Sequence, residues 1–342
     1  MSADRTAGRS PPIYDVYGVG NALVDMEYRV DDTFLARHDI AKGHMTLVEE
    51  AFLNRLKDDL SERPHERMSG GSAANTVMAI QGFGGSALYS CKVASDDVGR
   101  HFLEDLASAG VATNANAGTS DGLTGRCIVL VTDDAERSMN TFLGVSRSLG
   151  IAEIDEAALA GAGSLYIEGY LSAQPPGLTA AVRTRQLADE FAVPAAVSLS
   201  DPSMVTFFRD ELERLLGNGV HWLFCNEEEA LTWAGTDRLD LAIAELKDIG
   251  RACFITLGSR GSISVANGSS REVAGFAVEA IDTTGAGDIY AGACLHGLRV
   301  GMAEPQAARF GNYAAAALVR QYGARLRTTA DYRQLVEAFK GH

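Results

Sequence analysis

The sequence predicts an α/β fold with a central, mostly parallel β-sheet flanked by helices and a small β lid beside it. Two observations predict it. From about residue 151 short apolar runs alternate with helical segments, and two irregular β-rich stretches, at about 22–48 and 119–145, lie outside that alternation. Short buried strands that alternate with helices are typical of a parallel sheet covered on both faces. We expect a single domain over residues 13–340, after a flexible tail at 1–12.

The individual elements follow from apolar runs bounded by glycine, proline and polar turn residues. Strands are expected at residues 13–20, 87–94, 164–170, 195–200, 220–225 and 252–258. Helices are expected at residues 72–83, 97–110, 177–191, 203–216, 226–235, 285–300 and 304–320. Residues 126–143 and 261–280 predict hairpins, and the first should pair with strands of the 22–48 stretch to form the lid.

The composition argues against several classes of protein. A formal net charge of -15 is unlike that of a nucleic-acid-binding protein, which presents a basic face. The five cysteines are scattered without a C-x-x-C pair, so we expect reduced thiols and a cytoplasmic protein. No stretch is apolar and long enough to span a membrane, and the first twelve residues lack the apolar segment of a signal peptide.

The stretch DTTGAGD, residues 282–288, is the strongest candidate for a chemical site. It joins an apolar strand to a helix, so the backbone N–H groups of Gly285, Ala286 and Gly287 should point together at the helix N-terminus. The helix dipole favours an anion such as phosphate there. Asp288 could then accept a proton from a hydroxyl that attacks phosphorus. The alternative is that Asp288 only complements the helix dipole.

Polar residues also follow the other expected strands. Asn21 and Asp25 come after the first strand, GGSAAN (70–75) precedes a helix, and Asn226 and Glu229 share one helical face. Because ligands of open α/β sheets bind outside the carboxyl ends of the strands, these residues should gather at one site. Each also has a structural explanation: Asn226 could be a helix N-cap, and Asn21 and Asp25 turn residues.

These motifs resemble those of the PfkB/ribokinase family of small-molecule kinases. GGSAAN and DTTGAGD are similar to its two signatures, NEEE (226–229) to its N-x-x-E motif and TLGSRG (256–261) to its nucleotide loop. The similarity runs from about residue 14 to 325. It implies a ribokinase-like fold, ATP and Mg²⁺ as cofactors, and a nucleoside or sugar as the acceptor.

The resemblance implies a role for each matching residue. Asp288 would be the general base, Gly285, Ala286 and Gly287 the anion hole, and Arg137 an exposed lid residue that reaches the phosphates. The acceptor would contact Asn21, Asp25, Gly70, Gly71, Asn75 and Tyr170. ATP would contact Asn226, Thr256, Gly258, Gly261 and Asn312. Asn226 and Glu229 would organise Mg²⁺ through water, and Asp282 and Thr284 are candidates for a monovalent cation such as K⁺.

Several stretches, including YIEGYL (166–171) and VSLSDP (197–202), resemble the adenosine kinase branch of the family most. Leu171 and Met204 stand where aromatic residues are expected, so a sugar kinase acting on ribose, fructose or a keto-deoxy sugar acid stays an alternative. A nucleoside- or nucleotide-binding protein without catalysis is the alternative of another class. The lid strands could pair with a second subunit or be covered by their own domain.

Overall fold

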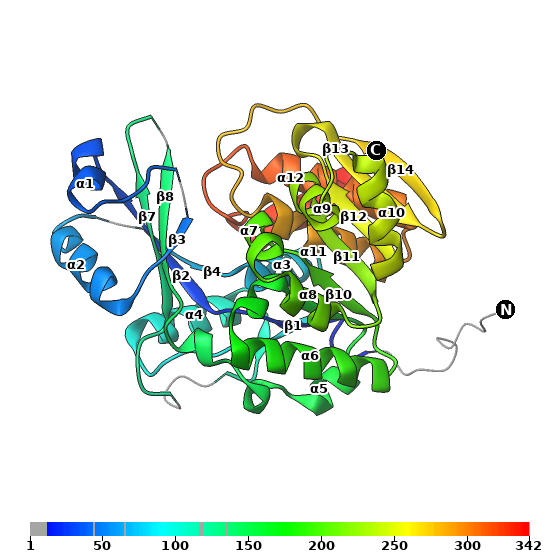
Figure 1. Ribbon diagram of the computed structural model, residues 1–342, viewed down its shortest axis with the longest axis horizontal. Coiled ribbons are helices and arrows are strands. Elements are labelled where there is room, and N and C mark those ends of the chain that lie inside the picture. The colour runs from blue at the N-terminus through cyan, green and yellow to red at the C-terminus, as the bar shows by residue number, and fades with distance from the viewer. Residues whose placement is uncertain (1–11, 44, 65, 116–119, 135, 342) are drawn as a thin grey trace.

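A large, mostly parallel sheet organises the chain (Figure 1). The computed structural model describes residues 12–43, 45–64, 66–115, 120–134 and 136–341. Within them the sheet has nine strands in the order β14-β13-β12-β11-β10-β9-β1-β5-β6. In chain order these strands are β1 (Val16–Val19), β5 (Ala87–Ser90), β6 (Ala112–Thr113), β9 (Leu165–Glu168), β10 (Ala195–Ser198), β11 (Val220–Asn226), β12 (Gly250–Thr256), β13 (Gly261–Ala266) and β14 (Ser269–Ala274). Only the β12–β13 and β13–β14 pairs are antiparallel.

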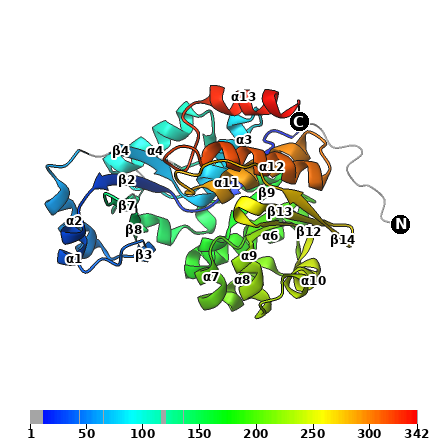
Figure 2. The same ribbon diagram turned by 90° about the horizontal axis from the view of Figure 1, so that it is seen from above.

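Helices cover both faces of this sheet, as Figure 2 shows from above. One face carries α3 (Ser72–Gly82), α4 (Asp97–Ser108), α11 (Ala286–Arg299), α12 (Glu304–Leu318) and α13 (Thr329–Phe339). The other carries α5 (Glu156–Ala160), α6 (Pro175–Glu190), α7 (Pro202–Phe207), α8 (Arg209–Leu216), α9 (Glu227–Ala234) and α10 (Leu239–Ile249). Strand β1 explains why two layers form: Val16 belongs to one buried cluster and Tyr17 and Val19 to the other.

A second sheet lies beside the large one and carries two further helices (Figure 1). Its strand order is β3-β8-β7-β2-β4. The elements are β2 (Leu23–Arg29), α1 (Asp32–Arg37), β3 (Met45–Leu47), α2 (Glu50–Leu60), β4 (Glu66–Gly70), β7 (Gly125–Val131) and β8 (Arg137–Phe142). Strands β2 and β7 pair in parallel, so the two irregular β stretches of the sequence do meet.

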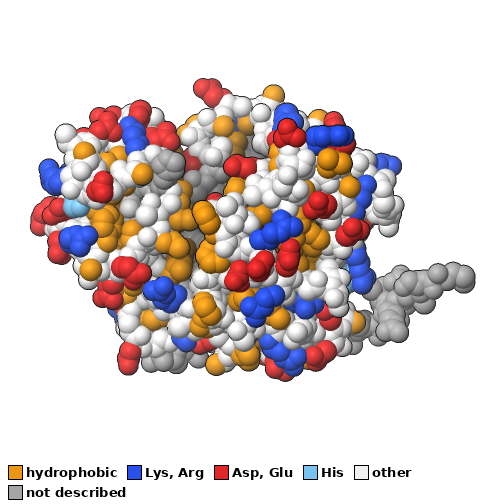
Figure 3. All heavy atoms as spheres, in the orientation of Figure 1, with side chains coloured by type: hydrophobic (Ala, Val, Ile, Leu, Met, Phe, Trp, Pro, Cys, Tyr) orange, Lys and Arg blue, Asp and Glu red, His pale blue; other side chains and the backbone are white. Residues whose placement is uncertain are grey.

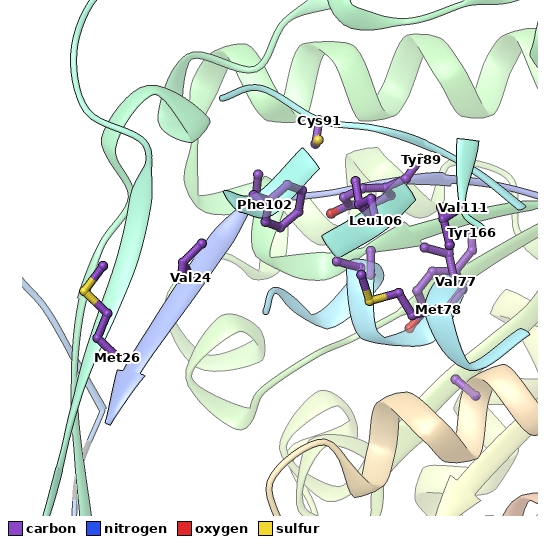
Figure 4. Packing of buried hydrophobic residues seen from close by; sticks show 14 of the residues in the cluster. Val24, Met26, Val77, Met78, Tyr89, Cys91, Phe102, Leu106, Val111 and Tyr166 are labelled. Carbon is purple, nitrogen blue, oxygen red and sulfur yellow. The ribbon is translucent and has the colours of Figure 1, made fainter. Parts of the chain in front are cut away.

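The two faces of the small sheet differ in what covers them. Ile128 and Leu130 of β7 belong to the buried cluster that includes Phe34 of α1 and Leu53 of α2. Figure 4 shows this cluster continuing from Val24 and Met26 of β2 toward α3, α4 and β5. Because side chains alternate along a strand, Asp25, Cys127 and Val129 lie on the opposite face. That face is turned toward the loop that precedes α11, since Arg137 of β8 reaches Asp282.

The predicted fold class is confirmed, and the local differences have physical causes. Residues 32–37 form a helix instead of a strand and turn, because the side chain of Asp31 caps the N–H of Phe34. The single helix expected at 203–216 is broken at Phe208, whose backbone is not helical. The sequence reasoning missed α2, β4, α10 and α13. Of the expected N-terminal tail, residues 1–11 lie outside the described residues.

Candidate active site

The N-terminus of α11 presents backbone N–H groups without acceptors. Gly285 caps the helix in the left-handed conformation (φ 73°), and a Cβ there would lie 2.3 Å from the carbonyl oxygen of Ala324. A Cβ at Gly287 would meet nothing within 4 Å, so Gly287 borders open space. The Ala286 N–H closes the preceding turn (3.1 Å), contrary to its predicted place in the anion hole. The N–H groups of Gly287 and Asp288 have no acceptor among the described residues, which leaves them available for an anion.

Asp288 lies in the first turn of α11, beside these amides. The hydroxyl of Ser72 donates to its Oδ1 (2.7 Å), and the amide of Asn75 donates to its Oδ2 (2.9 Å). Burial raises the pKa of Asp288 to about 6, while the two hydrogen bonds lower it. Asn75 Oδ1 is buried and accepts no hydrogen bond within the described residues. A carboxylate that titrates near neutral pH is well suited to take up a proton.

Asp25 lies within electrostatic range of Asp288, on the face of β2 turned toward the loop that precedes α11. It packs on Gly70, where a Cβ would lie 2.7 Å from Asp25 Oδ2. Burial raises the pKa of Asp25 to about 6, although the positive charge of Arg137 lowers it. Gly71 caps α3 with φ 103°, and a Cβ there would lie 2.4 Å from a backbone oxygen. The predicted GGSAAN turn therefore needs both glycines.

Arg137 connects the small sheet to DTTGAGD. It was expected to be exposed, but its side chain is only 16% exposed, because Nη1 lies 3.0 Å from Glu27 Oε2 and 3.3 Å from Asp282 Oδ2. Its Nε and Nη1 atoms are buried without hydrogen-bond geometry to any described acceptor. Arg137 therefore links the small sheet to the loop that precedes α11, while its Nε–H has no partner within the described residues.

Asp282 and Thr284 were candidates for a cation site. Asp282 Oδ1 accepts hydrogen bonds from the N–H (2.9 Å) and hydroxyl (2.7 Å) of Thr284, and Oδ2 accepts one from the Gly323 N–H (2.9 Å). These bonds and the charge of Arg137 lower the pKa of Asp282 despite its burial. Both carboxylate oxygens therefore already have protein donors, an arrangement that supports the loop and does not favour a cation there.

Glu168, at the carboxyl end of β9, was missed by the sequence reasoning. Its side chain accepts hydrogen bonds from the N–H (2.8 Å) and the amide (2.7 Å) of Asn21 and from the N–H of Ala73 (2.8 Å). Burial raises its pKa to about 7. Gln174 donates to the remaining amide oxygen of Asn21 (3.2 Å), so the predicted acceptor ligand Asn21 is used within the protein. The position of Glu168 at a strand end was the available signal.

Asn226 and Glu229 form a reciprocal N-cap of α9. The side chain of Asn226 accepts from the Glu229 N–H (2.8 Å) and donates to Glu229 Oε1 (2.6 Å). Burial raises the pKa of Glu229 to about 8. Asn226 is therefore the N-cap of α9, as the structural alternative predicted. The side-chain oxygens of both residues already accept hydrogen bonds within this cap. No group of three potential metal-ligating side chains occurs among the described residues.

The residues predicted to bind ATP lie at the end of β12 and near β14. Thr256 ends β12 in register with Asn226 of β11. Gly258 is exposed at φ 61° with nothing within 4 Å of a Cβ. Gly261 is buried at φ 105°, where a Cβ would lie 2.2 Å from the Val273 carbonyl oxygen. Asn312 is buried, and its amide donates to that same oxygen (2.9 Å), so it holds β14 to α12.

Tyr170 follows β9 and is half-buried, with its hydroxyl 3.4 Å from the Ser200 carbonyl oxygen. Burial raises its pKa well above the usual value, and the charges of Asp201, Asp288, Glu168 and Glu229 add to this. The strand ends therefore do converge. Leu171 and Met204, which were expected beside Tyr170 in the acceptor pocket, are buried in the core.

One protein family matches most of the chain. The family described as pfkB family carbohydrate kinase matches residues 44–330. The chain belongs to the pfkB family of carbohydrate kinases. Its two signatures lie within the matched segment, at the N-termini of α3 and α11. Within the described residues, no helix is long and apolar enough to cross a membrane.

Relatives in the pfkB family carry different substrate names. An adenosine kinase from Sinorhizobium meliloti is 34% identical, with a TM-score of 0.84 over 96% of this chain and 99% of that one. A probable sugar kinase protein from Rhizobium etli is 32% identical, with a TM-score of 0.86 over 96% of this chain and 98% of that one. Guanosine-inosine kinase from Escherichia coli is 26% identical over 64% of this chain, which spans about half (52%) of that enzyme.

Proposed function

We propose that this kinase transfers the γ-phosphoryl group of ATP to a primary hydroxyl, and that its acceptor is a nucleoside, adenosine first of all. The observation that carries the proposal is the pairing at the start of α11, where the Asp288 carboxylate lies next to amides without acceptors. Phosphoryl transfer requires positioning, charge neutralisation and a group that accepts the hydroxyl proton. This helix N-terminus offers both charge neutralisation and a proton acceptor.

The acceptor hydroxyl would be deprotonated by Asp288. Ser72 and Asn75 hold the carboxylate from α3 and leave its raised pKa near 6, so it is ionised at neutral pH and still basic enough to accept a proton. The attacking oxygen forms a bond to the γ-phosphorus as the bond to the β-phosphate oxygen of ATP breaks. The N–H groups of Gly287 and Asp288 stabilise the charge on the phosphoryl oxygens.

The acceptor's remaining hydroxyls would bind Asp25 and Asn75. The Asp25 carboxylate has a pKa raised to about 6, and a diol that donates two hydrogen bonds would stabilise its charged form. Asn75 Oδ1 is buried without a hydrogen bond within the described residues and can accept one from a hydroxyl. This end of the site suits a ribose ring.

An apolar patch next to Asp25 favours a nucleoside over a free sugar. Cys127, Val129 and Val131 form a buried apolar cluster with Met139, and Cys127 is in register with Asp25. Leu47 of β3, which is 58% exposed, continues the patch at the edge of the sheet. Figure 3 shows hydrophobic side chains along the furrow between the part of the molecule built on the small sheet and the part built on the large sheet. A planar base could pack against the exposed part of this patch, Leu47 and Met139, whereas a free sugar would leave that part uncovered.

Arg137 would approach the phosphates when the small sheet closes over the substrates. Its Nε–H group has no partner within the described residues and is available to a phosphate oxygen, and its position between the small sheet and the DTTGAGD loop couples closure to charge neutralisation. Mg²⁺ bound to ATP would neutralise the phosphate charge. Asn226 and Glu229 could contact it only through water, because their side chains cap each other.

A sugar kinase is the second candidate, supported by the 32% identical relative from Rhizobium etli. A binding protein without catalysis has less support, because a carboxylate that titrates near 6 beside an anion site gives a binder no advantage.

The test is ADP release by the purified chain with ATP and Mg²⁺, with adenosine, inosine, guanosine, ribose or fructose as the acceptor. We expect turnover with adenosine at least tenfold above that with either sugar, and AMP as the product. Preference for a sugar would retain the phosphoryl site and reject the role of the apolar patch. If none of these acceptors supports ATP-dependent turnover, the proposed acceptor class is rejected.

A further inference from the structure

A second cleft lies outside the proposed active site, and its lining comes from the small sheet, α3, α4 and the segment that leads into α13. Its volume is about 780 Å³, which is within the range of sites that bind small organic ligands. Its charged and titratable lining includes Arg29, Arg67, His101, Asp105, Arg325 and Arg327. None of the residues that hydrogen-bond to Asp288 lines it.

The cleft is cationic on a chain whose formal net charge is -15. Its two acidic side chains already have partners, since Asp105 lies 2.7 Å from Arg325 and Glu27 lies 3.0 Å from Arg137. The side chains of Arg29 and Arg327 are exposed and form no ion pair within the described residues. Two guanidinium groups of the cleft lining, one from β2 and one from the segment that leads into α13, are therefore available to an anion.

Two buried polar atoms in the same cleft also lack partners. Nε2 of His101 and Nε of Arg325 are buried and form no hydrogen bond within the described residues. A buried donor without an acceptor is unfavourable, and native structures contain few of them. An oxyanion in the cleft would give Nε of Arg325 an acceptor, and would do the same for Nε2 of His101 when that nitrogen carries a proton.

The remaining walls are apolar and aromatic. Met68, Met78, Leu326, Tyr322 and Tyr332 also line the cleft. A bare inorganic ion would leave these walls uncovered, whereas an organic anion with a flat apolar part would bury them.

We propose that this cleft binds a phosphate monoester of about mononucleotide size, with its phosphate between Arg29 and Arg327. Guanidinium groups bind phosphate oxygens in pairs, which favours phosphate over a monovalent ligand of the same size. The cleft shares a support with the proposed active site, because Gly323, which holds Asp282, lies in the segment that also carries Tyr322 and Arg325.

The test is calorimetric titration of the full chain with AMP, without ATP, in the presence and absence of saturating adenosine. We expect AMP to bind in both conditions. The double variant Arg29→Gln with Arg327→Gln should weaken that binding at least tenfold and leave kcat and KM of the kinase reaction unchanged. Arg333→Gln is the matched control, because Arg333 is exposed on α13 and does not line the cleft.

Three results would overturn the proposal. Displacement of AMP by adenosine would show that AMP occupies the acceptor site. Equal weakening by Arg333→Gln would show an effect of net charge alone. Inorganic phosphate binding as tightly as AMP would remove the role of the apolar walls. Because the readout is binding by variants outside the kinase site, a failure here is distinct from a failure of the proposed reaction.

Discussion

Replacing Asp288 by Asn should abolish most turnover and make the protein more stable at alkaline pH. The substitution conserves shape and removes a charge that burial disfavours. The Asn oxygen can accept from the Asn75 amide, and the Asn amide can donate to Ser72 once that hydroxyl rotates. Neither hydrogen bond has to be lost.

The expected stabilisation follows from the pKa of Asp288, which burial raises from 3.8 to about 6. A group whose pKa is higher in the folded state contributes stability below its unfolded pKa and loses it as pH rises through the folded value. Two pKa units correspond to about 3 kcal/mol, and partial exposure reduces this to about 1–2 kcal/mol. At pH 8 the free energy of unfolding of the variant should exceed that of the wild type by this amount, and at pH 4 the difference should vanish.

The turnover should fall by about 10²–10⁴-fold, which is the usual contribution of a general base. In the wild type, kcat/KM should rise as pH rises through about 6, because Asp288 must lose its proton to act. Asp25 also titrates near 6 and lies within range of Asp288, so the two share this acid limb. The residual activity of the variant should lack the part of the rise in kcat/KM with pH that the titration of Asp288 produces.

Urea unfolding at pH 4 and pH 8 and ADP-release kinetics from pH 5 to 9 measure both effects. Asp25→Asn is the matched control: it removes a carboxyl with a similarly raised pKa, and we expect it to raise KM for the acceptor more than it lowers kcat. Near-normal turnover of Asp288→Asn would refute the assignment of the base. A loss of stability at pH 8 would refute the reasoning about the buried charge.

The remaining predictions concern the loop, the bridging arginine and the buried carboxyls. Gly287→Ala should keep or slightly raise the melting temperature, because its Cβ meets nothing within 4 Å, and should lower kcat at least tenfold by occupying the space above the amides. Gly285→Ala should instead destabilise by more than about 2 kcal/mol, since the left-handed φ and the clash at 2.3 Å add together, and similar melting curves for the two variants would contradict this contrast. Arg137→Gln should lower kcat by about 10²-fold and also the melting temperature by a few degrees, because Asp282 loses an ion pair; an unchanged KM and kcat would remove Arg137 from the reaction. The wild-type free energy of unfolding should fall between about pH 5 and 8, where Glu168 (pKa about 7) and Glu229 (about 8) lose their protons in the fold, and a rise over that interval in urea titrations would show that their burial is misjudged.

Much of the fold could be read from the sequence because its signals are local. Alternating apolar runs and helix ends predicted β9 to β12 and α11 nearly at their observed bounds, and the turn glycines marked the start of α3. The missed elements have weaker signals. Helix α10 follows an exposed loop, and β4 is a short strand whose pairing partner, β2, lies some forty residues earlier.

The candidate site was predictable where a motif lies within one turn or helix. Gly285, Gly287 and Asp288 stand together in seven residues, so the helix geometry alone aligns the amides and the carboxylate. The N-x-x-E spacing is also a local signal, but it is compatible with both a role in Mg²⁺ binding and a helix N-cap. The fold shows Asn226 and Glu229 bonded to each other, which spacing could not decide.

By itself the sequence determined the fold class, the family and the anion-binding turn with its aspartate. The tertiary structure alone decided which polar groups have partners and which remain available. Asn75 reaches Asp288 across 213 positions, and Glu168 holds Asn21 across 147, so neither contact has any trace in local spacing. The physical reason is that a buried polar side chain takes its partner from whichever elements pack around it. That packing placed Arg137 between the small sheet and the loop that precedes α11, and gathered the arginines of the second cleft from three separate stretches of the chain.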